Sequence, residues 1–355
     1  MNIYSTVHVN AGSGYDVTIG NGILDNCGRL IGSLLTTRRV AVVTDSNVEP
    51  LYLDRVRASL EAEGFAVTAF AFEAGEQSKN IATLGQILEF FARSGLTRKD
   101  CAIALGGGVV GDITGFAAGC YMRGIDYIQI PTTTLAAIDS SVGGKTAIDL
   151  DAGKNLAGLF IQPRAVLCDT DCLSTLSAEI YADGLAEAVK ASILNDPELF
   201  SLFESGEAGA NPQMVIDRCV RFKAWVVEQD EKENGLRKML NLGHTPAHAI
   251  EKLSGYSIRH GQAVAMGMGV MARASAVRGY CTAECAARIE KALAACGLPA
   301  DTGFSADDMA VIAASDKKRT AGGVSVVLVR DIGDCVFEEV SLENISGLFA
   351  DGTES

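Results

Sequence analysis

The chain has 355 residues, 48% of them hydrophobic, which is enough to bury a large core and suggests about two domains. Lys and Arg number 30 against 44 Asp and Glu, and the resulting net charge of −14 argues against nucleic acid or an anionic membrane as a partner. No apolar run is long enough to span a membrane, and the first residues lack the pattern of a signal peptide. We therefore expect a cytoplasmic protein.

The first half of the chain alternates short β-branched runs with helical stretches. The runs cover residues 39–44, 65–72, 101–105, 127–130 and 165–170, and a helix is predicted at about 80–93. Strands that alternate with helices are typical of a parallel sheet, so residues 1–176 are predicted to form an α/β domain. Ahead of these strands, STVHVNAGSGYDVTIG predicts a β-hairpin.

From residue 177 onward the apolar periodicity is helical. Helices are predicted at about 178–195, 211–229, 246–253, 262–279 and 283–296. The late pair GVSVVLV and DCVFEEV predicts a small hairpin. Residues 177–355 are therefore predicted to form a second, mainly helical domain.

A glycine-rich turn follows the strand CAIAL. Gly106, Gly108 and Gly111 satisfy GxGxxG, and the helix that follows would direct its N-terminus at a phosphate. Asp126 precedes its strand, so Asp45, at the end of RVAVVTD, is the better ribose or adenine partner. A tight turn without any ligand is the alternative interpretation.

A second glycine-rich stretch, DSSVGGKT, resembles the end of a phosphate-binding P-loop. Asp139 stands where that motif requires glycine, which argues against an ATPase. Lys145, Lys154 and Asn155 nevertheless lie on glycine-rich turns, where ammonium and backbone N–H groups could converge on an anion. Exposed loop lysines would give the same pattern.

The helix predicted at 178–195 carries Glu187 and Lys190 three residues apart, with Asp183 one turn before them. Taken alone, this spacing is typical of a solvated helix face with a weak ion pair.

Three of the four histidines lie within residues 241–261. His244 and His248 could form a zinc-binding HxxxH pair on one helix face. Pro246 favours another interpretation, because proline prefers the first helical position and Thr245 is a good N-cap. His244 would then lie just outside the helix, and His260 lies before the next one. Two histidines at helix starts, with a carboxylate from elsewhere, would form an open three-ligand metal site.

Five long segments occur in order between about residues 40 and 320: GGGVVGDITGFAAGCYMRG, PTTTLAAIDSSVGGKTAIDL with GKNLAGLF, GLAEAVKASIL, RKMLNLGHTPAHAIE and RHGQAVAMGM. Together they resemble the 3-dehydroquinate synthases of the sugar phosphate cyclase group. The resemblance implies an N-terminal Rossmann-like α/β domain plus an all-α C-terminal domain, assembled as a homodimer. It also implies an NAD- and zinc- (or cobalt-) dependent lyase of the shikimate pathway of aromatic amino acid biosynthesis.

The implied reaction converts 3-deoxy-D-arabino-heptulosonate 7-phosphate, a phosphorylated and carboxylated sugar, into 3-dehydroquinate and phosphate. It proceeds by NAD-mediated oxidation, β-elimination, reduction and intramolecular aldol closure. The implied metal ligands are Glu187, His244 and His260, in place of the HxxxH pair.

The remaining implied residues fall into two groups. Those implied for NAD are Asp45, Glu76, Lys79, Gly108, Gly111, Asp112, Thr132, Thr133, Asp139, Lys154 and Thr175. Those implied around the substrate are Lys145, Asn155, Lys190, Lys223, Arg237, Asn241, His248, Lys317 in preference to Lys318, and Arg123, which would reach the neighbouring subunit's site.

The chain departs from the family pattern at three positions. The usual HTFGHA is HTPAHA here, with Pro246 in place of phenylalanine. The usual HGEAV is HGQAV, with Gln262 in place of glutamate, and the usual DGEQ is AGEQ, with Ala74 in place of aspartate. None of these removes an implied ligand, although Gln262 adjoins a metal histidine.

Three other functions share parts of these patterns. Another sugar phosphate cyclase would not need the carboxylate-binding residues. A metal-dependent glycerol or alcohol dehydrogenase would release NADH stoichiometrically and would not need the phosphate-binding lysines. A non-catalytic NAD- and metal-binding module would need no catalytic polar residues, yet all of those implied are present.

Overall fold

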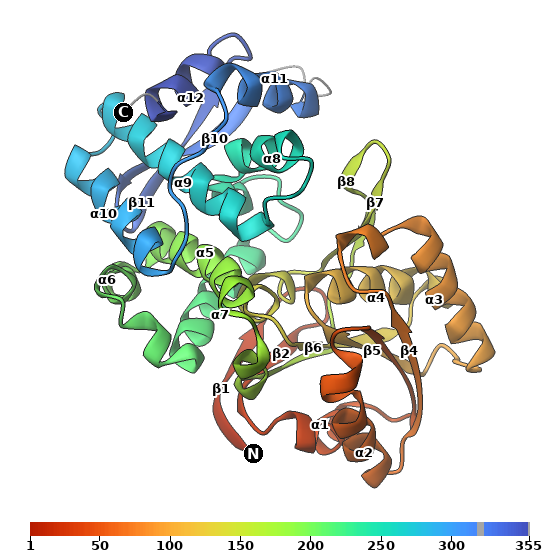
Figure 1. Ribbon diagram of the computed structural model, residues 1–355. Helices are drawn as coiled ribbons and strands as arrows, with labels where there is room; N and C mark the ends of the chain where they lie inside the picture. Colours follow the sequence, from red (N-terminus) through yellow and green to blue (C-terminus); the bar gives the residue numbers. More distant parts are fainter. Residues whose placement is uncertain (318–322, 354–355) are drawn as a thin grey trace. The chain divides into compact units, whose positions relative to one another are not determined.

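The computed structural model describes residues 1–317 and 323–353, without the side chains of residues 315–317 (Figure 1). The chain forms two compact units. The first contains Met1–Leu176 and Lys223–Lys232, and the second contains Ser177–Phe222 and Glu233–Ser355. Residues 223–232 thus belong to the α/β unit, although the sequence pattern groups them with the helical part.

The first unit is built on a seven-stranded sheet in the order β1-β2-β9-β6-β5-β3-β4. The edge pair β1–β2 is antiparallel, and every other pairing is parallel, which confirms the predicted α/β class. The strands are β1 (Asn2–Val9), β2 (Tyr15–Asn21), β3 (Arg39–Asp45), β4 (Ala66–Phe72), β5 (Cys101–Gly106), β6 (Asp126–Pro131) and β9 (Ala165–Asp169).

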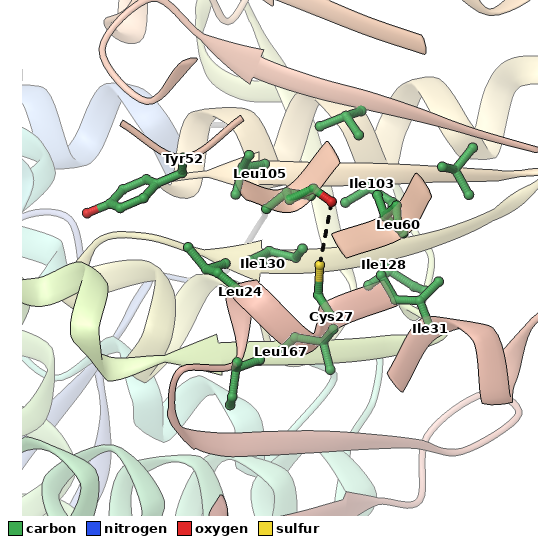
Figure 2. Close-up of a cluster of buried hydrophobic side chains, with 14 of the residues drawn as sticks. Leu24, Cys27, Ile31, Tyr52, Leu60, Ile103, Leu105, Ile128, Ile130 and Leu167 are labelled. Carbon is green, nitrogen blue, oxygen red and sulfur yellow. Dashed lines mark hydrogen bonds between the residues drawn. The ribbon is translucent and has the colours of Figure 1, made fainter. Parts of the chain in front are cut away.

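Helices cover both faces of this sheet (Figure 1). On one face, α1 (Cys27–Leu34) and α2 (Asp54–Ala62) pack through side chains such as Ile31 and Leu60 onto Ile103 and Ile128 (Figure 2). On the other, α3 (Ile81–Arg93) and α4 (Gly108–Cys120) form a second apolar core. Burial on both faces explains why β5 is apolar throughout, without the alternation of a half-exposed strand.

A separate hairpin of β7 (Lys145–Leu150) and β8 (Gly153–Phe160) was not predicted. Most of β8 is exposed, so its sequence has no clear pattern of buried residues. Gly158 explains the close pairing, because a Cβ there would lie 2.1 Å from the carbonyl oxygen of Thr146. The lysines expected on turns therefore lie at or near the ends of strands.

The second unit is mainly helical and contains the predicted small hairpin, β10 (Val324–Asp331) and β11 (Asp334–Val340). Its helices are α5 (Ala178–Asn195), α6 (Pro197–Ser205), α8 (His244–Leu253), α9 (His260–Val277), α10 (Ala283–Ala295), α11 (Ala306–Lys317) and α12 (Ile345–Thr353), and α7 (Pro212–Gln229) supplies residues to both units. Within the described residues, no helix meets the length and apolarity needed to cross a membrane.

The start of α8 differs from the prediction. The helix begins at His244, and its N-cap is Gly243 with φ 77°. The expected N-cap role of Thr245 is therefore wrong, and His244 lies inside the first turn. Pro246 is the third helical residue, where a missing N–H costs no intrahelical hydrogen bond.

Gly28 tests the packing of α1 against α2. A Cβ at this position would lie 2.0 Å from the carbonyl oxygen of Ser59. We expect Gly28→Ala to lower the apparent free energy of unfolding by about 1–3 kcal/mol, because the two helices must separate. Urea titration followed by circular dichroism measures this loss.

Gly85→Ala is the matched control. Gly85 lies in α3, and a Cβ added there would meet no neighbouring atom within 4 Å, so alanine should leave stability unchanged or raise it by up to about 1 kcal/mol. Equal losses in the two variants would contradict the steric explanation.

Candidate active site

Three side chains from three helices of the second unit form a potential metal centre. Glu187 lies in the middle of α5, whereas His244 and His260 are the first residues of α8 and α9. The Nε2 atoms of His244 and His260 lie 3.6 and 3.5 Å from Oε1 of Glu187. One ligand atom from each residue lies within 4.8 Å of the others.

The burial of Glu187 and Lys190 differs from the solvated ion pair that their spacing suggested. Glu187 is 2% exposed and Lys190 is 3% exposed, and the two form a close ion pair. Burial acts to raise the pKa of Glu187, but Lys190 and the two histidines outweigh it and hold this pKa well below its usual range. The carboxylate is therefore ionised inside the protein.

The two histidines have opposite electrostatic environments. Burial lowers the pKa of His244 well below its usual range, and Lys190 adds to this effect, so its imidazole is neutral. Burial also disfavours charge on His260, but Glu187 and Glu251 raise its pKa to about 10. His260 therefore carries a positive charge between two carboxylates, where a metal cation would be favoured.

These residues fit a divalent metal ion. Both oxygens of Glu187 are buried and lack a hydrogen-bond partner of regular geometry among the described residues. Two imidazoles and one carboxylate form the three-ligand set of an open zinc site, which leaves a position for a substrate oxygen. His248 is not part of this group, although its ring centroid lies 5.7 Å from that of His244.

A close contact between α5 and α9 sets the distance between Glu187 and His260. The N-cap of α9 is Arg259, which offers no side-chain acceptor, and Oδ1 of Asp183 accepts the N–H of Gln262 instead, at 3.1 Å. At Gly261, a Cβ would lie 1.9 Å from the carbonyl oxygen of Asp183. Asp183 precedes Glu187 by one turn, so the start of α9 is fixed beside the buried carboxylate.

In the first unit, all but one of the residues implied for NAD lie at or after the carboxyl ends of parallel strands. Asp45 ends β3, where its Oδ1 accepts the N–H groups of Asn47 and Val48 at 2.9 and 3.0 Å. Most of the others follow β4 (Glu76, Lys79), β5 (Gly108, Gly111, Asp112), β6 (Thr132, Thr133, Asp139) and β9 (Thr175), whereas Lys154 lies within β8 of the separate antiparallel hairpin. This edge of a parallel sheet is where nucleotides bind in such folds.

The turn between β5 and α4 provides a suitable cradle for a pyrophosphate. Gly107 is the N-cap of α4, and Gly108 begins the helix. A Cβ at Gly108 would lie 3.1 Å from Oγ of Ser140. The hydroxyls of Ser140 and Thr132 are buried without a hydrogen-bond partner in the described parts of the chain. The glycines allow a phosphate to come close to the backbone N–H groups, and the two hydroxyls could donate hydrogen bonds to it. Both features fit a nucleotide.

Lys79 joins several of the implied residues. Its Nζ lies 2.6 Å from Oδ2 of Asp112, 3.9 Å from Oε1 of Glu76 and 2.6 Å from Oδ1 of Asn155. Burial acts to lower the pKa of Lys79, but Asp112 and Glu76 outweigh it and raise the pKa. The ammonium therefore stays charged and links the loop after β4 to α4 and β8.

The structure brings Lys223 and Asp139 together. Nζ of Lys223 lies 2.7 Å from Oδ1 of Asp139 and donates to its carbonyl oxygen at 2.6 Å. Both belong to the first unit, whereas Arg237 and Asn241 belong to the second. Arg237 is 1% exposed, and the amide of Asn241 donates to Oε1 of Glu233 at 3.1 Å.

Three other implied residues, Lys145, Arg123 and Lys317, lie at the ends of secondary-structure elements. Lys145 begins β7, and Arg123 ends a short 3₁₀ turn with φ 67°. Lys317 ends α11, but its side chain lies outside the described residues, as does all of Lys318. Of the departures from the family pattern, Ala74 donates its N–H to Oγ of Ser46 at 3.0 Å.

Four side chains that lie beside the implied residues were not identified from the sequence. Glu233 and Asp149 hydrogen-bond Asn241 and the backbone N–H of Asn155. The other two are Ser140, which lies beside Gly108, and Glu251, which lies beside His260. Each belongs to a different helix from the residue beside it. Periodicity alone could have found only Glu251, which follows His244 and His248 at helical spacing on α8.

Comparison with known proteins identifies the family. The model of the 3-dehydroquinate synthase N-terminal family matches residues 69–183, and that of the C-terminal family matches residues 184–319. A 3-dehydroquinate synthase of Pelobacter propionicus is 44% identical over 96% of this chain and 98% of its own. One of Caulobacter vibrioides is 45% identical over 93% of each chain. The chain therefore belongs to the 3-dehydroquinate synthase family.

A solved structure has the same two-domain fold. The 2-epi-5-epi-valiolone synthase of Streptomyces hygroscopicus subsp. jinggangensis, with NAD⁺ and Zn²⁺ bound, superposes with a TM-score of 0.87 at 28% sequence identity. The match covers 94% of this chain and 95% of that one.

The geometry of the metal centre predicts different effects for its histidines. His244→Ala should lower bound zinc from about one ion per chain to below about a tenth of that, because a ligand is lost. His248→Ala should retain the metal. Metal analysis of the purified, dialysed proteins measures the content, and equal losses in both variants would instead support the HxxxH pair.

Proposed function

We propose that this chain is a 3-dehydroquinate synthase that converts 3-deoxy-D-arabino-heptulosonate 7-phosphate into 3-dehydroquinate and phosphate. Membership of the family over nearly the whole chain supports this activity. The observation that carries the chemistry is the cluster of the buried Glu187 with His244 and His260, beside Lys190. Such a cluster would hold a metal ion that binds a substrate hydroxyl and makes it easier to ionise. The oxidation of a sugar hydroxyl requires this ionisation.

We assign zinc or cobalt to Glu187, His244 and His260, and NAD to the carboxyl edge of the parallel sheet. When bound, the metal would lower the pKa of a substrate hydroxyl, and NAD would accept and return a hydride. Lys190 keeps Glu187 ionised in the absence of solvent. Asp45 is oriented by two backbone N–H groups and would accept a hydrogen bond from a ribose hydroxyl.

The cationic residues would bind the two acidic groups of the substrate. Lys145, Asn155 and Arg123 would hold the phosphate and stabilise the charge that grows on it as it leaves. Lys190 and the imidazole of His248 lie near the proposed metal, so His248 is the candidate for moving a proton at the reacting carbons. Lys317 is assigned to the substrate on family resemblance alone.

We assign the substrate carboxylate to Lys223, Arg237 and Asn241. Asp139 and Glu233 already hold the first and last of these in place, and Arg237 is almost fully buried. Two cations and an amide suit a carboxylate that must stay oriented during ring closure. We further propose a cytoplasmic homodimer in which Arg123 acts in the neighbouring subunit's site.

Two rival activities can be separated by their reactions. A metal-dependent glycerol or alcohol dehydrogenase shares the domain plan but forms NADH in proportion to product. A sister sugar phosphate cyclase would act on substrates without a carboxylate, such as sedoheptulose 7-phosphate or glucose 6-phosphate. Activity on these that matched or exceeded activity on the carboxylated substrate would overturn the assignment within the family.

The amount of NADH formed per phosphate released tests the proposed synthase reaction. Hydride leaves and returns within one cycle, so phosphate should be released from the heptulosonate phosphate over many turnovers per NAD. Absorbance from NADH should not grow with product. Chelation should stop phosphate release, and added zinc or cobalt should restore it. Stoichiometric NADH formation from a simple polyol would support the dehydrogenase instead.

Arg237 tests the carboxylate assignment. Arg237→Ala should lower kcat/KM by the equivalent of about 2–4 kcal/mol, because a desolvated carboxylate would lose its partner. Metal and NAD content should not change. Arg237→Lys is the control for folding, because it keeps the charge at this buried position and should retain more activity than alanine. Equal kcat/KM in wild type and Arg237→Ala would contradict the assignment.

A further inference from the structure

The buried carboxylate of Glu251 lies against the side of His260 that faces away from Glu187. Its Oε2 is 3.5 Å from Nδ1 of His260, while Nε2 of the same ring is 3.5 Å from Oε1 of Glu187. Glu251 is 4% exposed. The imidazole therefore lies between two carboxylates, with one at each ring nitrogen.

His244 is anchored in a parallel manner but by a different group. Its Nδ1 lies 3.2 Å from the backbone carbonyl oxygen of Leu242. In both histidines the Nδ1 atom thus has an acceptor beside it, and Nε2 is the atom that approaches Glu187. An Nδ1–H held by an acceptor leaves the Nε2 lone pair available for a metal.

The two anchors differ in charge, and this difference has a chemical consequence. A carbonyl only orients the ring, whereas a carboxylate also raises the basicity of the imidazole and adds a negative charge near the cation. Lys190 brings a positive charge into the same region through its ion pair with Glu187. Glu251 supplies a further negative charge beside His260.

Glu251 lies on the same face of α8 as His244 and His248, which supports a role at the metal centre. His244, His248 and Glu251 occupy one face of α8, at spacings of four and three residues. One helix therefore carries a metal ligand, a candidate proton carrier and the carboxylate beside the second histidine ligand. The ring of His260 approaches this face from α9.

We propose that Glu251 is a positioning residue for the metal centre, which fixes the tautomer and orientation of His260 and tightens divalent metal binding. This inference rests on the proposed metal centre and deepens it. Glu251 itself is not one of the proposed metal ligands. Its effect should appear in the affinity and the ligand field of the bound ion.

The test compares Glu251→Gln and Glu251→Ala with the wild-type chain after removal of bound metal. Zn²⁺ affinity is measured by competition with a chromophoric chelator, and the visible absorption of the Co²⁺-loaded protein reports the coordination. We expect about a 10-fold weaker affinity for glutamine, which keeps an acceptor without the charge, and up to about 100-fold for alanine. The Co²⁺ absorption should shift in both variants.

Glu290→Gln is the matched control. Glu290 lies on α10 of the same unit and pairs with Arg273 at 2.6 Å, so this change removes a charge away from the cluster. It should leave affinity and Co²⁺ absorption unchanged. Thermal unfolding of the metal-free proteins separates a general loss of stability from a specific effect on the metal.

Two outcomes are distinguishable. If wild type binds Zn²⁺ and Glu251→Gln matches it in affinity and Co²⁺ absorption, the role of Glu251 is wrong while the metal centre stands. If the wild-type chain binds no divalent metal, the proposed function itself is wrong. Should Glu251→Ala fail to fold, Glu251→Gln alone decides the question.

Discussion

The second unit is organised around one buried negative charge, the carboxylate of Glu187. An ion removed from water costs several kcal/mol unless other groups compensate it. Here the compensation comes from Lys190 on the same helix and from His260. The first turns of α8 and α9 also converge on this carboxylate, and helix N-termini carry partial positive charge. The same arrangement prepares a site for a metal cation.

This convergence of three helices depends on positions that have no side chain. At Gly261 the backbone of α9 touches that of α5, and a Cβ would lie 1.9 Å from a carbonyl oxygen. At Gly267 a Cβ would lie 2.0 Å from the carbonyl oxygen of Gly243, which is the N-cap of α8. The glycines allow two helices to begin beside a third, and the ligand distances follow from these contacts.

In the first unit, the residues implied for NAD are brought together by the parallel sheet and not by converging helices. Its parallel strands end at one edge, and the residues implied for NAD gather there from distant parts of the sequence. Lys79 connects three of these segments through Asp112, Glu76 and Asn155. A nucleotide site of this kind needs backbone N–H groups and small residues more than it needs buried charge. In the proposed function, the first unit would bind NAD and the second would bind the metal.

Much of the architecture could be predicted from the sequence because it depends on local patterns. The strands of the sheet and the helices of the second unit follow from apolar periodicity, which reflects the face that each element buries. The positions of His244 and His260 before predicted helices already suggested a shared metal site, but the choice of Glu187 as its carboxylate, and of this site over the HxxxH pair, required family resemblance. The hairpin of β7 and β8 escaped prediction because it buries too little of β8 to leave a pattern.

Sequence by itself therefore determined the family, the class of fold and the residue types of the site. Only the tertiary structure decided that Glu187 and Lys190 are buried, since i,i+3 spacing is the same on a solvated face and inside a core. It also decided that Asp183, Glu233 and Glu251 lie beside candidate functional groups. The reason is physical: burial and contact between α5, α8 and α9 arise from packing between segments far apart in the chain, which no local periodicity encodes.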